Sequence, residues 1–216
     1  MTTSTQIQLV SRPRGWPTHD DFRTVAVDLP DLADGEVRVA NEYLSVDPYM
    51  RGRMNEGRSY IPPFELNETM TGGAVGRVVE SRSDAHPVGA VVMHDLGWRD
   101  LAQGDGRQFR VVQEIEGVPV SAYLGILGTT GLTAYVGLLH IGRFRKGESV
   151  FVSGAAGSVG SAVGQIARLM GASKVVGSAG SAEKVEKATS SYGFDAALNY
   201  KDGPVRTLLR DHFGRE

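Results

Sequence analysis

The first half of the chain consists of short apolar runs separated by clusters of glycine, proline and aspartate. These runs are too short for helices and show little 3.6-residue periodicity, so they predict β-strands joined by turns. Strands at such close spacing are typical of a small, irregular β-barrel. The predicted strands cover residues 6–10, 22–29, 36–45, 76–81, 90–95 and 108–113.

The pattern changes near Tyr123, after which strands and helices alternate. An apolar, β-branched run at 148–153 is typical of a strand buried on both faces. Apolar residues at helical spacing follow it, and Gly171 is a suitable residue to end that helix. Because the next strand, at 174–177, begins about twenty residues further on, this segment predicts a βαβ unit.

The remaining residues predict two more helices and one more strand. A helix begins after Ser181, a favourable N-cap residue, and a strand and a helix follow at 196–200 and 204–213. Three strands and three helices make half of a doubly wound parallel sheet. We therefore predict a β domain at 1–122 and a partial α/β domain at 123–216. An incomplete sheet exposes a strand edge that recruits other chains, so we expect a homodimer or other self-association.

Composition and charge narrow the functional classes. Hydrophobic residues make up 41% of the 216 residues and charged residues 22%, as in globular proteins. The 23 Lys and Arg residues nearly balance 25 Asp and Glu residues, which makes nucleic acid a poor partner. With no cysteine, disulfides, thiolate nucleophiles and sulfur-ligated zinc are excluded. No signal peptide or run of about 20 apolar residues is visible, so we expect a cytoplasmic protein without a membrane span.

A glycine-rich loop separates the predicted buried strand from the helix after it. It reads Gly154-Ala155-Ala156-Gly157-Ser158-Val159-Gly160, with glycine at the first, fourth and seventh positions. Gly157 would let backbone N–H groups approach a pyrophosphate at the positive helix end, and Gly160 would let helix and strand pack closely. This context predicts a dinucleotide site, with a tight turn built for steric reasons alone as the alternative.

The end of the second parallel strand bears on the choice of cofactor. In NAD sites an acidic residue at this point accepts hydrogen bonds from the ribose 2′-hydroxyl. Residues 177–181 contain only glycine, serine and alanine, and Lys184 follows them. Because a lysine and small hydroxyl residues favour a 2′-phosphate, we predict NADP(H) rather than NAD(H). The alternative is that Lys184 is a solvated helix lysine.

Four segments together resemble the medium-chain, zinc-free NADP-dependent reductases, and within them the prostaglandin, plant alkenal double-bond and bacterial curcumin reductases. The first segment reads Leu-Ser-Val-Asp-Pro-Tyr-Met-Arg-Gly-Arg-Met, and the segments together cover residues 44–54, 128–135, 154–160 and 176–184. The resemblance extends over essentially the whole chain but over only about the first two thirds of the family's length.

The resemblance implies a GroES-like catalytic domain followed by a partial Rossmann domain. It also implies NADPH-dependent reduction of the carbon–carbon double bond of α,β-unsaturated ketones or aldehydes, with hydride added to the β-carbon. In the second domain, it implies that the pyrophosphate is contacted by Gly157, Ser158, Val159 and Gly160. It implies that the 2′-phosphate is contacted by Lys184 and Tyr200.

In the first domain, the resemblance implies a proton donor or substrate contact at Tyr60 and substrate-binding residues at Tyr49 and Arg51. Each of these has a structural alternative. The tyrosines are also compatible with a buried ring and a solvated hydroxyl, and the arginine with pairing to a surface acid.

Two departures from the family pattern leave other functions open. Thr129-Thr130 stands where the family has Met-Pro, and the chain ends at Glu216, before further family cofactor contacts. One alternative is a truncated, catalytically inactive relative that binds nucleotide or serves as an assembly module. Another is a quinone oxidoreductase, which shares the zinc-free scaffold.

Overall fold

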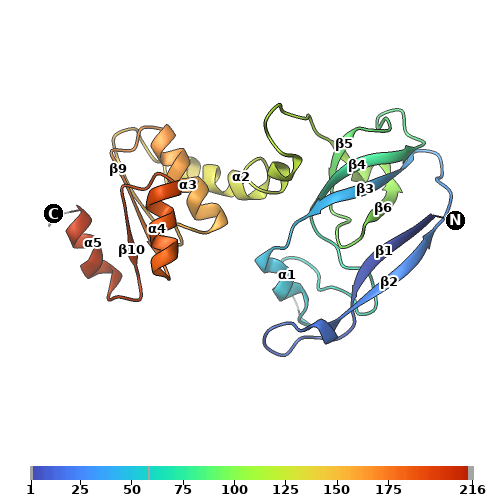
Figure 1. Cartoon of the computed structure of the whole chain (residues 1–216), viewed down its shortest axis with the longest axis horizontal. Helices are drawn as coiled ribbons and strands as arrows, with labels where there is room; N and C mark the ends of the chain where they lie inside the picture. Colours follow the sequence, from blue (N-terminus) through green and yellow to red (C-terminus); the bar gives the residue numbers. More distant parts are fainter. Residues whose placement is uncertain (1, 58, 214–216) are drawn as a thin grey trace. The chain divides into compact units, whose positions relative to one another are not determined.

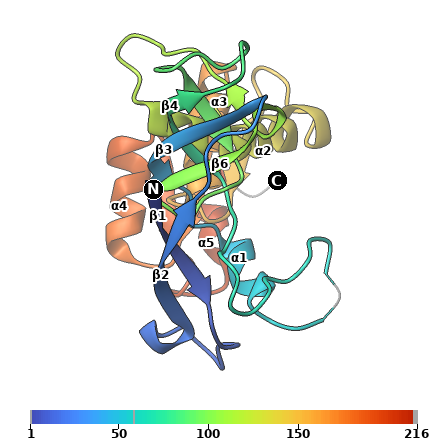
Figure 2. The same cartoon turned by 90° about the vertical axis from the view of Figure 1, so that its right-hand side faces the viewer.

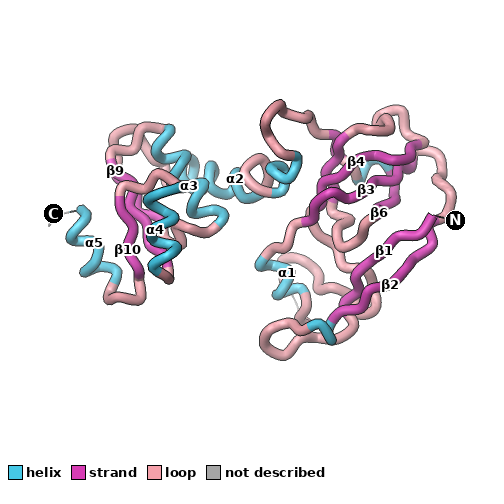
Figure 3. The backbone as a smooth tube through the Cα atoms, viewed as in Figure 1, coloured by secondary structure: helices cyan, strands magenta, loops and turns pink. Residues whose placement is uncertain are grey.

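The computed structural model describes residues 2–57 and 59–213, and the chain divides into two compact units (Figure 1). The N-terminal unit is Met1–Leu124 and the C-terminal unit is Gly125–Glu216. Most strands belong to the N-terminal unit, whereas strands and helices alternate in the C-terminal unit (Figure 3).

The N-terminal unit is built from antiparallel strands. A hairpin pairs β1 (Thr2–Leu9) with β2 (Phe22–Leu29), and Figure 2 shows it in blue. A five-stranded sheet has the order β6-β3-β4-β5-β7. Within the described residues these strands form two sheets, with isolated bridges such as Gln6–Arg99, and no closed barrel. The sheet strands are β3 (Glu36–Leu44), β4 (Ala74–Ser81), β5 (Val91–His94), β6 (Leu101–Asp105) and β7 (Arg110–Val111).

Three short helical segments lie between these strands, η1 (His19–Asp21), α1 (Pro48–Arg53) and η2 (Gly106–Gln108), and a fourth, η3 (Val120–Leu124), follows β7. In α1, Pro48 occupies the first turn, where its fixed φ suits a helix and its missing N–H costs nothing. One face of α1 joins a core cluster around Leu9, Met50, Met54, Phe64 and Met70. That packing fixes α1 beside the segments on either side of it.

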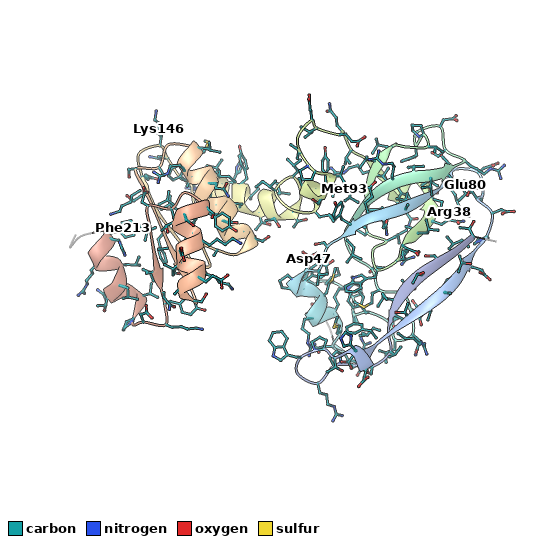
Figure 4. The ribbon with its side chains drawn as sticks, in the orientation of Figure 1. Arg38, Asp47, Glu80, Met93, Lys146 and Phe213 are labelled. Carbon is teal, nitrogen blue, oxygen red and sulfur yellow. The ribbon has the colours of Figure 1, made fainter. Side chains whose placement is uncertain are left out.

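Arg38 is the most deeply buried arginine of the β sheet, at 5% exposure. Its guanidinium donates to Glu80 on the neighbouring strand (Figure 4). It also donates to the Gln103 side chain and to the Pro30 carbonyl. A buried cation is tolerated only when its donors are satisfied, and here several acceptors surround it.

The C-terminal unit is a parallel sheet of order β10-β9-β8 with helical crossovers. Helix α3 contacts β8 and β9, and α4 contacts β9 and β10. Helix α2 continues into a π-helical turn, η4. The elements are α2 (Thr129–Tyr135), η4 (Val136–Ile141), β8 (Ser149–Val152), α3 (Ser158–Leu169), β9 (Lys174–Ala179), α4 (Ala182–Ser191), β10 (Ala196–Asn199) and α5 (Val205–Phe213).

The buried ring of Phe194 fills the space between α3 and β9. A Cβ added at Gly164 on α3 or at Gly177 on β9 would collide with this ring, approaching its Cδ atoms to 3.1 Å and 2.9 Å. Two glycines far apart in the sequence therefore let a helix and a strand close on one aromatic side chain.

The predicted fold class is confirmed, since antiparallel β structure precedes half of a doubly wound sheet. One strand and one α-helix were not predicted. Strand β6 contains only Leu101 and Ala102 as apolar residues, and α1 is a single short helix after a proline. The predicted strand at 108–113 is shorter in the structure, because Asp105 caps a 3₁₀ turn at 106–108.

Candidate functional site

The glycine-rich loop of the C-terminal unit joins β8 to the N-terminus of α3. Gly154 has φ +61°, in the left-handed region that favours glycine. The Ala155 N–H donates to the Ser178 carbonyl at 2.9 Å and so ties the loop to β9. Gly157 is the N-cap of α3 and has no side chain to accept from the first-turn N–H groups. Those groups, at Ser158, Val159 and Gly160, also lack intrahelical acceptors and mark the positive helix end.

Gly160 packs directly against the start of the loop. A Cβ at this position would collide with the Gly154 carbonyl oxygen, and it would lie 2.8 Å from the carbonyl carbon and 3.0 Å from Ala155 Cα. A Cβ at Gly157 would lie 3.2 Å from the same oxygen. The loop can therefore keep this conformation only with glycine at 160.

Replacing Gly160 by alanine is expected to lower the free energy of unfolding of the C-terminal unit by about 1–3 kcal/mol, because backbone atoms must move to admit the methyl group. Urea denaturation followed by far-UV circular dichroism measures the change. Gly203→Ala is the matched control, since a Cβ there meets nothing within 4 Å. Equal effects of the two variants would contradict the steric argument.

Residues at the carboxyl ends of β9 and β10 form the second part of this site. The Tyr200 N–H donates to the Ala179 carbonyl at 3.1 Å, and a Cβ at Gly180 would lie 2.9 Å from Tyr200 Cζ. Ser181 caps α4 by accepting from the Lys184 N–H at 3.4 Å. The fold thus brings Tyr200 against Gly180, and exposed Lys184 lies in the first turn of α4.

The N-terminal unit holds Tyr49 on α1 in a charged environment. Burial raises the pKa of the Tyr49 hydroxyl, the charges of Asp47 and Asp95 raise it further, and Arg53 opposes them. A tyrosine hydroxyl is protonated at neutral pH even at its ordinary pKa, and the shift is in the same direction, so Tyr49 is a hydrogen-bond donor. Sequence reasoning assigned nothing to Arg53, although its position four residues after Tyr49 on a helix is a signal of proximity.

Arg51 and Tyr60 differ in their hydrogen bonding and exposure. The Arg51 guanidinium donates to the Gly15 carbonyl at 2.8 Å and 3.1 Å, to the Pro13 carbonyl at 3.1 Å and to the Asn55 side chain at 2.7 Å. Arg51 thus holds the loop before η1, and its role in substrate binding stays a prediction. Tyr60 is 87% exposed, and its hydroxyl makes no hydrogen bond to another described residue.

A groove of about 370 Å³ lies in the N-terminal unit between β1, β3 and the loop after β5. Trp98 lines it with φ +61°, a strained value for a bulky residue. The Asn41 side chain donates to the Leu96 and Arg99 carbonyls at 3.3 Å and 2.9 Å, and buried His94 hydrogen-bonds to Asn41 at 2.8 Å. This network holds the strained loop in place.

Two further properties concern the described part of the chain. Over residues 2–57 and 59–213, no group of three or more His, Cys, Asp or Glu residues has the arrangement of a metal site. None of the helices described in those ranges is both long and apolar enough to cross a membrane.

Two protein-family models match the chain. The model described as the N-terminal domain of oxidoreductase matches residues 5–112, and the model described as zinc-binding dehydrogenase matches residues 158–215. The first lies within the N-terminal unit and the second begins at the first residue of α3.

Curated proteins and solved structures show the same likeness. A putative NADP-dependent oxidoreductase, YfmJ, of Bacillus subtilis is 49% identical over 93% of this chain and 59% of its own length. The NADPH-dependent curcumin reductase of Escherichia coli is 43% identical over 89% of this chain and 55% of its own length. The crystal structure of CurA from Vibrio vulnificus in complex with NADPH superposes with a TM-score of 0.86 at 40% identity, over 96% of this chain and 61% of that one. The chain therefore spans only part of the length of the relatives it matches.

Proposed function

Because the chain belongs to the medium-chain NADP-dependent oxidoreductases, we propose that this protein binds NADPH and reduces the carbon–carbon double bond of α,β-unsaturated ketones or aldehydes. The observation that carries the proposal is the β8–loop–α3 unit, with no acidic residue at 177–181. Lys184 and Tyr200 follow the neighbouring strands β9 and β10. Self-association and a cytoplasmic location stay predictions.

The residues present fit NADPH. The absence of side chains at Gly157 and Gly160 opens the end of α3 to a pyrophosphate, which the first-turn N–H groups of Ser158, Val159 and Gly160 would hold. The half-exposed Tyr200 ring and the Lys184 ammonium would contact the 2′-phosphate. When bound, NADPH supplies the hydride for the β-carbon of the substrate.

The tyrosines of the N-terminal unit would act on the substrate oxygen. Negative charge develops on the carbonyl oxygen as the double bond is reduced, and a hydroxyl donor stabilises that charge. Tyr60 carries an exposed hydroxyl, and Tyr49 carries one whose pKa is raised by burial. We assign proton donation or carbonyl polarisation to Tyr60, and substrate contact to Tyr49.

Oxidation of NADPH in the presence of an aryl enone, followed at 340 nm, tests the function. We expect turnover with NADPH and an enone, and a Tyr60→Phe variant with kcat lower on the order of 100-fold. Tyr192→Phe is the control, because Tyr192 packs against the core of the C-terminal unit. Cofactor binding without enone-dependent oxidation would refute the reductase assignment, and preferred turnover of a quinone would favour a quinone oxidoreductase.

A further inference from the structure

One side chain of α1 reaches the loop that carries Tyr60. The Arg53 Nε donates to the Pro62 carbonyl at 2.8 Å, and its Nη1 donates to Thr71 Oγ1 at 3.1 Å. The guanidinium carbon also lies 3.9 Å from the ring centroid of Phe64. Arg53 thus connects α1 to both the loop before Phe64 and the segment that leads into β4.

The loop is fixed at Phe64 and open at Tyr60. Phe64 is 4% exposed and packs with Leu9 and Met50, and its N–H donates to the Arg53 carbonyl at 2.7 Å. Tyr60, in contrast, is 87% exposed. Of the hydrogen bonds among described residues, the one from Arg53 to Pro62 is the nearest in sequence to Tyr60. Arg53 therefore anchors the chain two residues after Tyr60.

The same guanidinium also acts on Tyr49, one helical turn earlier. Its charge lowers the pKa of Tyr49, against the larger effect of burial and the charges of Asp47 and Asp95. Among the described residues Arg53 forms no ion pair with a carboxylate, and its donors are directed to the Pro62 carbonyl and to Thr71. A planar guanidinium with five donors suits such a divided role better than an ammonium does.

We propose that Arg53 is a positioning residue for enone reduction, which holds the Tyr60 loop against α1 and so sets the two tyrosines in one fixed arrangement. The proposal rests on the proposed function. It assigns to Arg53 no contact with substrate or cofactor. Arg53 would affect turnover only by positioning Tyr60, so the effects of substitutions at the two residues should not be additive.

A double-mutant cycle between Arg53 and Tyr60 measures this non-additivity in kcat. We expect Arg53→Met to lower kcat for an aryl enone by at least about tenfold and to leave the affinity for NADPH unchanged, since positioning contributes to the barrier. Tyr60→Phe, which lowers kcat on the order of 100-fold in the wild type, should lower it by less than about threefold in the Arg53→Met background. Arg53→Lys should restore part of the activity, because an ammonium can still donate to one acceptor.

Hydrogen–deuterium exchange of the same proteins gives a readout that does not need turnover. Peptides spanning 59–66 should exchange faster in Arg53→Met than in the wild type, whereas β4 peptides at 74–81 should not change. Arg107→Met is the control, because Arg107 is exposed and pairs with Asp105 in a local turn. It should alter neither turnover nor exchange at 59–66.

The outcomes separate the two proposals. If Tyr60→Phe lowers kcat by the same factor in both backgrounds, or if exchange at 59–66 is unchanged, Arg53 does not position Tyr60 and the inference is wrong. If the wild type shows no enone reduction while Arg53→Met still exchanges faster at 59–66, the proposed function fails and the contribution of Arg53 to turnover fails with it. The restraint that Arg53 places on residues 59–66 would then be a structural property without a role in turnover.

Discussion

Replacing Lys184 by alanine is expected to weaken NADPH binding by about 10- to 100-fold and to leave NADH binding unchanged. A charge-assisted hydrogen bond to a phosphate contributes about 1.5–3 kcal/mol, and the 2′-phosphate is the group by which NADPH differs from NADH. Lys184 lies in the first turn of α4, whose N-cap Ser181 follows the Gly180 that Tyr200 covers. Calorimetric titration of the chain with each cofactor measures both affinities.

A second lysine on the same helix provides the matched control. Lys187 is exposed, and its ammonium lies 5.8 Å from the Tyr192 ring centroid, so Lys187→Ala should bind NADPH as the wild type does. Tyr200→Phe, which keeps the ring over Gly180 and removes the hydroxyl, should cost NADPH affinity without affecting NADH. A Lys184→Ala variant that loses both cofactors equally would show that Lys184 does not read the 2′-phosphate.

Acidification from pH 6.5 to about 4 is expected to lower the free energy of unfolding of the N-terminal unit by about 3 kcal/mol through His94 alone. Burial, and to a smaller extent the charge of Arg99, lowers the pKa of His94 to about 4. The ring is 6% exposed, its Nε2 faces the Asn41 side-chain oxygen at 2.8 Å, and its Nδ1 accepts from the Leu96 N–H at 3.0 Å. In the neutral ring, both nitrogens thus form hydrogen bonds.

The direction of this effect follows from proton binding. The unfolded chain takes up a proton at His94 near pH 6.5, whereas the folded chain resists it until about pH 4. Between these values the unfolded state binds more protons, so falling pH favours unfolding. Above pH 6.5 the stabilisation is fully present, and no further change from this residue is expected.

Urea denaturation at several pH values, followed by tryptophan fluorescence, measures the slope. The chain has 2 tryptophans, Trp16 and Trp98, and both belong to the N-terminal unit. His94→Gln should lose the extra slope between pH 6.5 and 4, whereas His140→Gln, at an exposed position of η4, should retain it. A wild-type slope that survives in His94→Gln would assign the pH dependence to other groups.

Local sequence patterns are sufficient to predict the C-terminal half of the candidate site. The order of strand, glycine loop and helix, the glycines at 157 and 160, and the missing acid before Lys184 are local features. Residues a few positions apart carry them, and backbone geometry turns them directly into a loop and a helix end. That is why the predicted βαβ unit and its glycines have counterparts in the structure, whereas the cofactor contacts assigned to them stay proposals.

The contacts of the candidate residues in the N-terminal unit depend on tertiary structure. The Arg53–Thr71 hydrogen bond joins residues 18 positions apart, and the His94–Asn41 bond joins residues 53 positions apart. Strand β6 forms because β3 offers it an edge, since its own apolar pattern is too weak. No local pattern specifies which distant acceptor a guanidinium or an imidazole will meet. The packing of α1 and the pairing of β3 with its neighbours bring those partners together.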